Sequence, residues 1–203
     1  MVGTITPTNG LFSQTWQNMY EGIHRANDAI VNIPAKSPVA NDVKARLVAE
    51  CKFLRAYYYY RLNQVFEGVP VYLEPVEAEN ANRPRASADS VWNVVLRDLT
   101  DCINEPALPG RYNAGNAAHG RVTKGAAYAL RGKVYMYQKR WAEAAADLRQ
   151  VEPLGFALNP NYRALFTEAQ EQSAEMIFAI QNIGITGLGS TTQFFCGTRA
   201  SFG

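Results

Sequence analysis

The amino-acid sequence predicts a mostly α-helical fold, in which helical hairpins stack as a right-handed, tetratricopeptide-like superhelix with long loops and a short strand near the C-terminus. Three observations lead to this prediction. Apolar residues recur every three or four positions through several stretches, which is the spacing of a helix buried on one side. Loops rich in proline or glycine separate these stretches. Two neighbouring stretches also carry small and aromatic residues in the order of a tetratricopeptide repeat.

The first helix is expected over residues 13–33, where Trp16, Tyr20 and Ile23 lie on one apolar stripe. Pro34 follows directly. It is expected to begin a loop, because proline has no backbone N–H to donate to a helix.

The second helix is expected over residues 41–66 and contains four consecutive tyrosines, in KFLRAYYYYRL. Successive helical residues point about 100° apart, so four rings in a row cannot form one flat shelf for a ligand. One apolar stripe runs through Tyr58 and a second through Tyr57 and Tyr60. We therefore predict that the tyrosines fill the space between neighbouring helices, with their hydroxyls bonded to carboxylates or to the backbone.

An extended, proline-rich insertion is expected over residues 67–86. Three further helices are expected after it, at residues 88–103, 124–138 and 141–153. Ser87 and Thr123 stand where the first two of these begin, and both are favoured N-caps.

The last two helices carry the tetratricopeptide pattern. Its aromatic, small and leucine positions are Tyr128, Gly132, Tyr135, Ala144 and Leu148. Gly132 and Ala144 are small where the paired helices must approach closely. Arg131 stands where the repeat usually has leucine, so the match is partial. After this hairpin, residues 161–166 predict a short helical turn and residues 174–183 a lone strand.

Composition excludes several classes of function. The net charge is +2 without a basic stripe, which argues against a nucleic-acid partner. No apolar run approaches the ~20 residues that a membrane span needs. Cys51, Cys102 and Cys196 are widely spaced, and His24 and His119 have no evident metal or nucleophile partner. We therefore expect no metal, no cofactor and no catalytic residue.

Four segments, in this order, resemble the SusD/RagB family of Bacteroidetes outer-membrane nutrient-binding lipoproteins. They are WQNMYEGIHRANDAI; AECKFLRAYYYYRLNQVFEGVPV; RASADSVWNVVLRDL followed by GRVTKGAAYALRGKVYMYQKRWAEA; and NYRALFTEAQEQSAEMIFAI. The second is the most specific, because the family reads Ala-Glu-x-x-Phe-Leu-Arg-Ala-Tyr-x-Tyr there. One departure is Glu67, where the family usually has glycine, and Gly68 is expected to take over its role.

The resemblance implies a non-enzymatic protein that captures oligosaccharides and delivers them to a TonB-dependent, SusC-like transporter. It implies an outer-membrane location, with attachment only through a lipidated cysteine that this sequence does not contain. It also implies two regions: a tetratricopeptide-like scaffold over residues 1–172, and the start of a truncated, loop-rich, ligand-facing region over residues 173–203. We expect the chain to be a fragment of such a protein.

The candidate ligand-binding residues are Trp16, Asn18 and Asn9. Sugar recognition combines an aromatic face with amide groups for the hydroxyls, and Trp16 follows a loop rich in such residues. The alternative is that Trp16 is the first position of the core stripe that includes Tyr20 and Ile23.

Three other charged positions have structural interpretations. Arg83 and Arg85 are expected to be solvated or paired with carboxylates, with a transporter contact as the alternative. Asp98 falls on an apolar stripe, so it is expected to receive an arginine or a tyrosine from a neighbouring helix.

Two other functions compete with glycan capture. The repeat-like hairpin alone would equally suit a tetratricopeptide scaffold that binds another protein and has no sugar site. An α-helical glycoside hydrolase would need two carboxylates opposed across a cleft, and no acidic pair stands in a suitable loop.

Overall fold

In a computed structural model of the chain, the described residues are 10–170 and 172–180. They form five α-helices: α1 (Gly10–Lys36), α2 (Asn41–Phe66), α3 (Ala88–Asn104), α4 (Lys124–Tyr137) and α5 (Trp141–Leu148). Three 3-10 turns follow, at Glu152–Leu154, Tyr162–Phe166 and Glu168–Gln170. Within these described residues no strand is present, and no helix is long and apolar enough to cross a bilayer.

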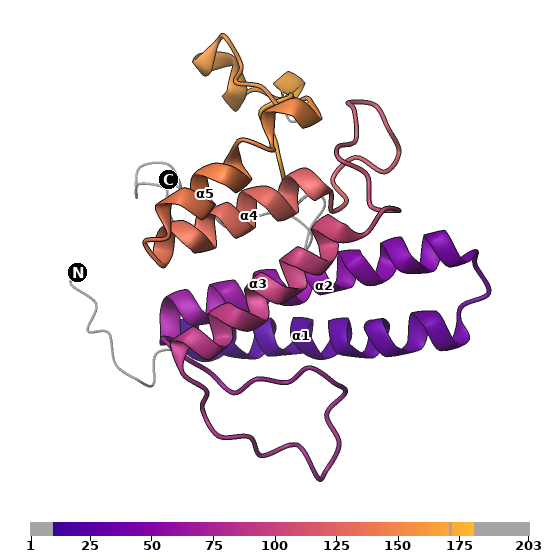
Figure 1. Cartoon of the computed structure of the whole chain (residues 1–203), viewed down its shortest axis with the longest axis vertical. Coiled ribbons are helices and arrows are strands. Elements are labelled where there is room, and N and C mark those ends of the chain that lie inside the picture. The colour runs from indigo at the N-terminus through magenta and orange to yellow at the C-terminus, as the bar shows by residue number, and fades with distance from the viewer. Residues whose placement is uncertain (1–9, 171, 181–203) are drawn as a thin grey trace, which may run out of the picture.

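The helices pack in chain order, α1 on α2, α2 on α3, α3 on α4 and α4 on α5, as Figure 1 shows. This arrangement confirms the mostly helical, tetratricopeptide-like fold class. The caps confirm two of the predicted starts, because the Ser87 hydroxyl accepts from Ser90 N at 3.1 Å and the Thr123 hydroxyl from Ala126 N at 3.2 Å.

Helix α1 is longer than expected, and the predicted stop at Pro34 is wrong. Pro34 lies inside the last turn of α1. The amide of Ser37 still donates to the carbonyl of Ile33 at 3.2 Å, so the helical pattern continues past the proline. A proline so close to a helix end removes only one hydrogen bond.

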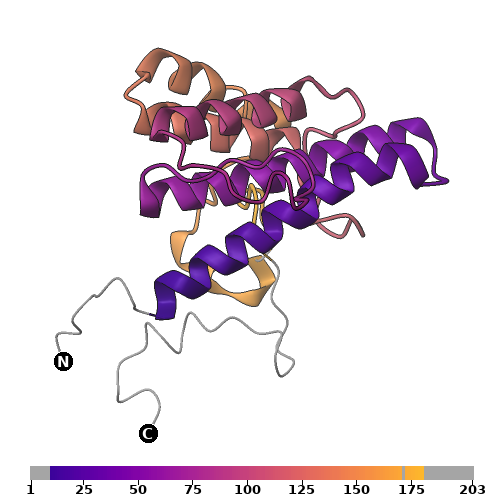
Figure 2. The ribbon, with the colours of Figure 1, turned by 90° about the horizontal axis from the view of Figure 1, so that it is seen from below.

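Helix α2 has the predicted bounds and is covered on two sides. The insertion crosses it on the side nearest the viewer in Figure 2, where the hydroxyl of Tyr59 donates to the carbonyl of Tyr72 and accepts from its amide. On another side the ring of Phe178 packs against Phe53 and Tyr57, with centroids 5.0 and 6.3 Å apart. This confirms that the tyrosine-rich helix fills the space between neighbours.

The two apolar stripes predicted for α2 nevertheless leave out one buried tyrosine. Tyr59, which lay on neither stripe, is fully buried, whereas Tyr57 and Tyr58 are half-buried. The reason is the insertion, which supplies a backbone amide and carbonyl for the Tyr59 hydroxyl. Burial raises the pKa of that hydroxyl to about 12, and the backbone hydrogen bond to Tyr72 opposes the shift.

The C-terminal end of α2 explains the Glu67–Gly68 departure. Glu67 takes the left-handed conformation itself, with φ 50°, and Gly68 follows with φ 97°. Arg85 reaches back and donates to the carbonyls of Phe66, Glu67 and Gly68. Arg85 is exposed to solvent, as expected, and its partners are backbone carbonyls and not a carboxylate. It closes the end of the helix, whereas Arg83 pairs with Glu74 as expected.

Replacing Glu67 by glycine is expected to stabilise the protein by about 1 kcal/mol, because glycine adopts the left-handed conformation without the cost that other residues incur. Urea unfolding, followed by circular dichroism, measures the change. A loss of stability would show that the Glu67 side chain contributes more than its backbone strain costs.

The α4–α5 hairpin has the close approach that its pattern predicts. A Cβ added to Gly132 would lie 2.9 Å from Cγ of Leu148 and 3.4 Å from the carbonyl oxygen of Ala144. Arg131, in the usual leucine position, instead forms a two-pronged ion pair with Asp147, at 2.6 and 2.7 Å. It also donates to the hydroxyl of Thr100 at 2.9 Å, so one side chain joins α3, α4 and α5.

The chain after α5 differs from prediction in one element. The turn predicted at residues 161–166 is present, but over the described residues 174–180 the strand predicted at 174–183 is wrong. The amide of Ala157 donates to the carbonyl of Ala174 at 3.2 Å, and beyond that point the segment is placed by side chains packed on α2. Most of the predicted second region, 173–203, lies outside the described residues.

Candidate functional site

The predicted ligand-binding residues do not form one site in the described structure. The Trp16 ring is half-buried against Tyr20 and Phe66, with centroids 4.8 and 5.0 Å apart. Asn18 is two residues further along α1, about 200° around the helix, where it is exposed and accepts from Gln14 at 2.7 Å. Asn9 lies outside the described residues. Trp16 thus packs as the core-stripe alternative expects, and a role of these residues in binding stays a prediction.

The polar residues inside the fold form a network that joins three helices and the insertion. Arg55 of α2 donates to both carboxylate oxygens of Asp98 on α3, at 2.7 and 2.9 Å, which confirms the partner expected for Asp98. Arg55 also donates to Asn27 Oδ1 on α1 at 2.8 Å. The amide of Asn27 donates in turn to the carbonyls of Tyr72 and Glu74, at 3.1 Å each. The network therefore holds the insertion against the helices.

Two further carboxylates are engaged by arginine in the same way. Glu50 receives Arg121 through two hydrogen bonds, and Asp147 receives Arg131. These bonds raise the pKa of both guanidinium groups, because each bond to a carboxylate favours the charged form. The carboxylates inside the fold thus act as structural partners of arginine.

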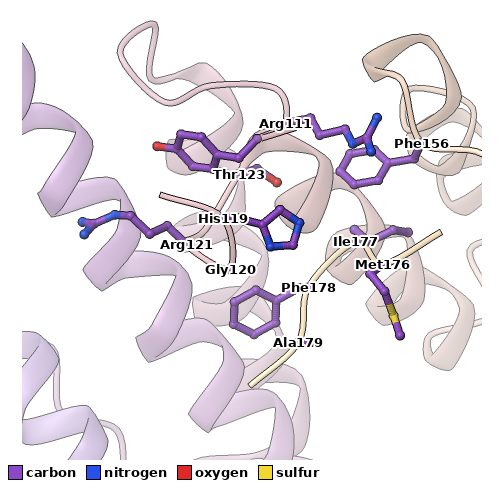
Figure 3. A pocket seen from close by; sticks show the side chains of 11 residues that line it. Arg111, His119, Gly120, Arg121, Thr123, Phe156, Met176, Ile177, Phe178 and Ala179 are labelled. Atoms are coloured by element: carbon purple, nitrogen blue, oxygen red, sulfur yellow. The ribbon is translucent and has the colours of Figure 1, made fainter. Parts of the chain in front are cut away.

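Two adjacent hollows border the segment 176–180 where it crosses α2. Figure 3 shows the first, where Arg111 and His119 of the loop between α3 and α4 and Phe178 of the later segment line one space. The Arg111 guanidinium lies 5.2 Å from the centroid of Phe156. The imidazole of His119 makes no side-chain hydrogen bond to any of the described residues shown around it.

The second hollow, of about 440 Å³, is the better candidate for a ligand site. Its walls are the rings of Tyr57, Tyr58 and Phe178, and the Glu50–Arg121 ion pair lies at its edge. Aromatic faces beside a few polar groups suit the binding of a polar organic molecule that has apolar faces. Sequence reasoning missed this hollow, because the loop and the segment that complete it with α2 are distant in the sequence.

Of the two described cysteines, Cys102 is buried and Cys51 is half-buried. Burial raises the pKa of the Cys102 thiol to about 12, so the thiol stays protonated, and it donates to the carbonyl of Ala49 at 3.1 Å. Within residues 10–170 and 172–180, no group of three histidine, cysteine or acidic side chains could hold a metal ion. Cys196 lies outside that part of the chain.

The sequence and the helical fold are matched by a known family. Residues 3–136 match the model of the SusD-like proteins, described as "Starch-binding associating with outer membrane". The chain belongs to the SusD-like family.

Three SusD-like relatives illustrate the likeness. SusD-like protein P25 of Formosa agariphila is 25% identical over 170 residues, which is 83% of this chain and 32% of that protein. A laminarin-binding SusD-like protein of known structure superposes with a TM-score of 0.75 at 34% identity, over 81% of this chain and 36% of its own. Surface glycan-binding protein A of Bacteroides thetaiotaomicron, in complex with laminarihexaose, gives a TM-score of 0.71 at 27% identity, over 83% of this chain and 34% of its own. This SusD-like chain spans about a third of the length of these relatives.

Proposed function

We propose that the protein is a non-enzymatic glycan-binding protein of the outer membrane, which captures oligosaccharides and delivers them to a TonB-dependent, SusC-like transporter. The observation that carries this proposal is the family match together with the likeness to solved proteins whose names record laminarin and laminarihexaose as ligands. Attachment to the membrane through a lipid anchor belongs to the same proposal.

The geometry of the acidic residues supports a binding role over hydrolysis. A glycoside hydrolase needs two carboxylates that face each other across the scissile bond. Glu50, Asp98 and Asp147 each accept two hydrogen bonds from one arginine. Carboxylates held in this way are not available to protonate a leaving group or to attack a sugar.

The hollow beside Tyr57 and Tyr58 is one part of the described structure that suits a sugar. Isothermal titration of the complete protein with laminarihexaose, xylohexaose, mannohexaose and a galacturonic acid hexamer tests the proposal. Saturable heat with at least one of them and no release of reducing ends is the expected result. A folded protein that binds none of the four, or that cleaves one, would contradict it.

A tetratricopeptide scaffold without a sugar site is the second candidate, and the α4–α5 hairpin favours it. Affinity capture from an outer-membrane extract, with the recovered proteins identified by mass spectrometry, separates the two. Recovery of a TonB-dependent transporter supports the proposed function. Recovery of another partner, together with failure in the titration, supports the scaffold.

A further inference from the structure

Three helices bring a second group of aromatic side chains together, beyond the hollow described above. Tyr60 lies near the C-terminal end of α2, Trp92 in the first half of α3 and Tyr137 at the end of α4. The Tyr60 ring is buried and forms the floor, with its centroid 6.0 Å from that of Trp92 and 6.1 Å from that of Tyr137. The other two rings reach the surface, and Tyr137 is 54% exposed.

The two outer rings lie nearly in parallel. The planes of Trp92 and Tyr137 differ by 17°, and their centroids are 6.3 Å apart. Parallel rings at this separation are laterally offset, so each leaves part of its face uncovered. Together they present a stepped aromatic surface.

Polar groups surround this aromatic pair. The Gln64 side-chain amide donates to the Tyr137 hydroxyl at 2.7 Å, which fixes the ring and leaves the amide oxygen of Gln64 as an acceptor. Lys133 lies one helical turn before Tyr137, with its Nζ 6.0 Å from the Tyr60 centroid. Arg61 is exposed on α2, one turn before Gln64. Neither cation forms an ion pair with any residue that the structure describes.

We propose that Trp92 and Tyr137 form a stacking platform for an oligosaccharide, with Gln64, Lys133 and Arg61 bonding to its hydroxyl groups. The proposal rests on the proposed function and gives it a location outside the hollow. The apolar C–H face of a pyranose ring would lie on the exposed ring faces. Tyr57, Arg61 and Gln64 are spaced i, i+4 and i+7 along α2, so the platform continues the helix face that borders the hollow.

A second exposed aromatic pair lacks the parallel arrangement of Trp92 and Tyr137. Tyr162 and Phe166 are 74% and 76% exposed, but their planes meet at 77°, edge against face, with centroids 5.4 Å apart. They present no common face to a sugar chain. Exposure alone would equally suit a contact with a protein. Parallel rings with hydrogen-bonding groups at their edge favour a glycan.

The test uses the complete protein and the four hexasaccharides named above. Trp92→Ala and Tyr137→Ala are each expected to weaken binding of the best hexasaccharide by about tenfold or more, because each removes a stacking face. Tyr137→Phe keeps the ring and loses the hydroxyl that bonds to Gln64 and Tyr60, so a smaller loss, about threefold, is expected. Tyr162→Ala, which removes a still more exposed tyrosine outside the platform, is the control and is expected to bind like the unmodified protein.

Tryptophan fluorescence of the folded, unmodified protein tests directly whether the hexasaccharide binds beside Trp92. The hexasaccharide is expected to change the emission of the unmodified protein, and Trp92→Phe is expected to abolish this change while Trp16 and Trp141 remain. If the unmodified protein binds a hexasaccharide and the folded Trp92→Ala and Tyr137→Ala variants bind it equally well, the platform proposal is wrong and the proposed function stands. If those variants lose only the capture of the transporter, the surface is a protein contact. If the unmodified protein binds no glycan, both proposals fail.

Discussion

Replacing Arg55 by leucine is expected to lower the free energy of unfolding by about 3–5 kcal/mol, because it leaves the Asp98 carboxylate buried without its partner. The two side chains are 4% and 1% exposed, so water cannot replace the lost hydrogen bonds. The same substitution removes the donors to Asn27 Oδ1 and to the carbonyl of Leu73, at 2.8 and 3.1 Å, and so loosens the insertion as well.

Urea unfolding of three variants separates the cost of an unpaired buried carboxylate from the cost of the other lost hydrogen bonds. The double variant Arg55→Leu with Asp98→Leu is expected to recover a large part of the lost stability, because removing both partners leaves no unpaired charge. Lys52→Leu breaks a pair with Asp101 of the same length, 2.7 Å, but both of its side chains are partly exposed. That control is expected to lose at most about 1 kcal/mol. Equal losses for Arg55→Leu and Lys52→Leu would contradict the importance of burial.

Replacing Gly68 by alanine is expected to cost about 3 kcal/mol. Its φ of 97° is strained for any residue with a side chain, and the added Cβ would lie 2.5 Å from the carbonyl oxygen of Ala86. That oxygen belongs to the backbone, so the clash cannot be relieved by a side-chain rotation. The insertion would have to move away from the start of α3.

Gly115 provides the matched control for Gly68. Its φ is 78°, but an added Cβ would meet nothing within 4 Å. Gly115→Ala therefore measures the backbone strain alone, expected at about 1 kcal/mol. Thermal and urea unfolding of both variants give the difference that is due to the clash. If Gly68→Ala were no less stable than Gly115→Ala, the insertion would be able to move away from the added Cβ without a loss of stability.

Local patterns were sufficient to predict that each of the five helices exists and two of their caps, although α1 extends to Lys36 and α5 ends at Leu148, short of the predicted residue 153. The bounds of α2, the N-caps Ser87 and Thr123, and the small residue Gly132 between α4 and α5 were predicted because each depends on residues a few positions apart. The type of side chain that pairs with Asp98 was also predicted, since a carboxylate on an apolar stripe needs a cation or a hydroxyl group as its partner.

The candidate binding surfaces could not be predicted in the same way. The hollow beside Tyr57 needs residues 120–122 and 178–180, and the platform needs Trp92 beside Tyr137. No periodicity relates positions so far apart in the sequence. Trp16, the aromatic residue that the sequence offered as a sugar contact beside its core-stripe alternative, packs against Phe66 at the C-terminal end of α2.

Sequence patterns were enough to predict a stack of helical hairpins with a tyrosine-rich helix packed between its neighbours, and to identify the family that the segments resemble. Contacts between distant segments set which tyrosine is fully buried and which rings meet at the surface. The physical reason is that helix formation and capping depend on near neighbours, whereas the burial of Tyr59 depends on a backbone amide and carbonyl 13 residues away in the insertion.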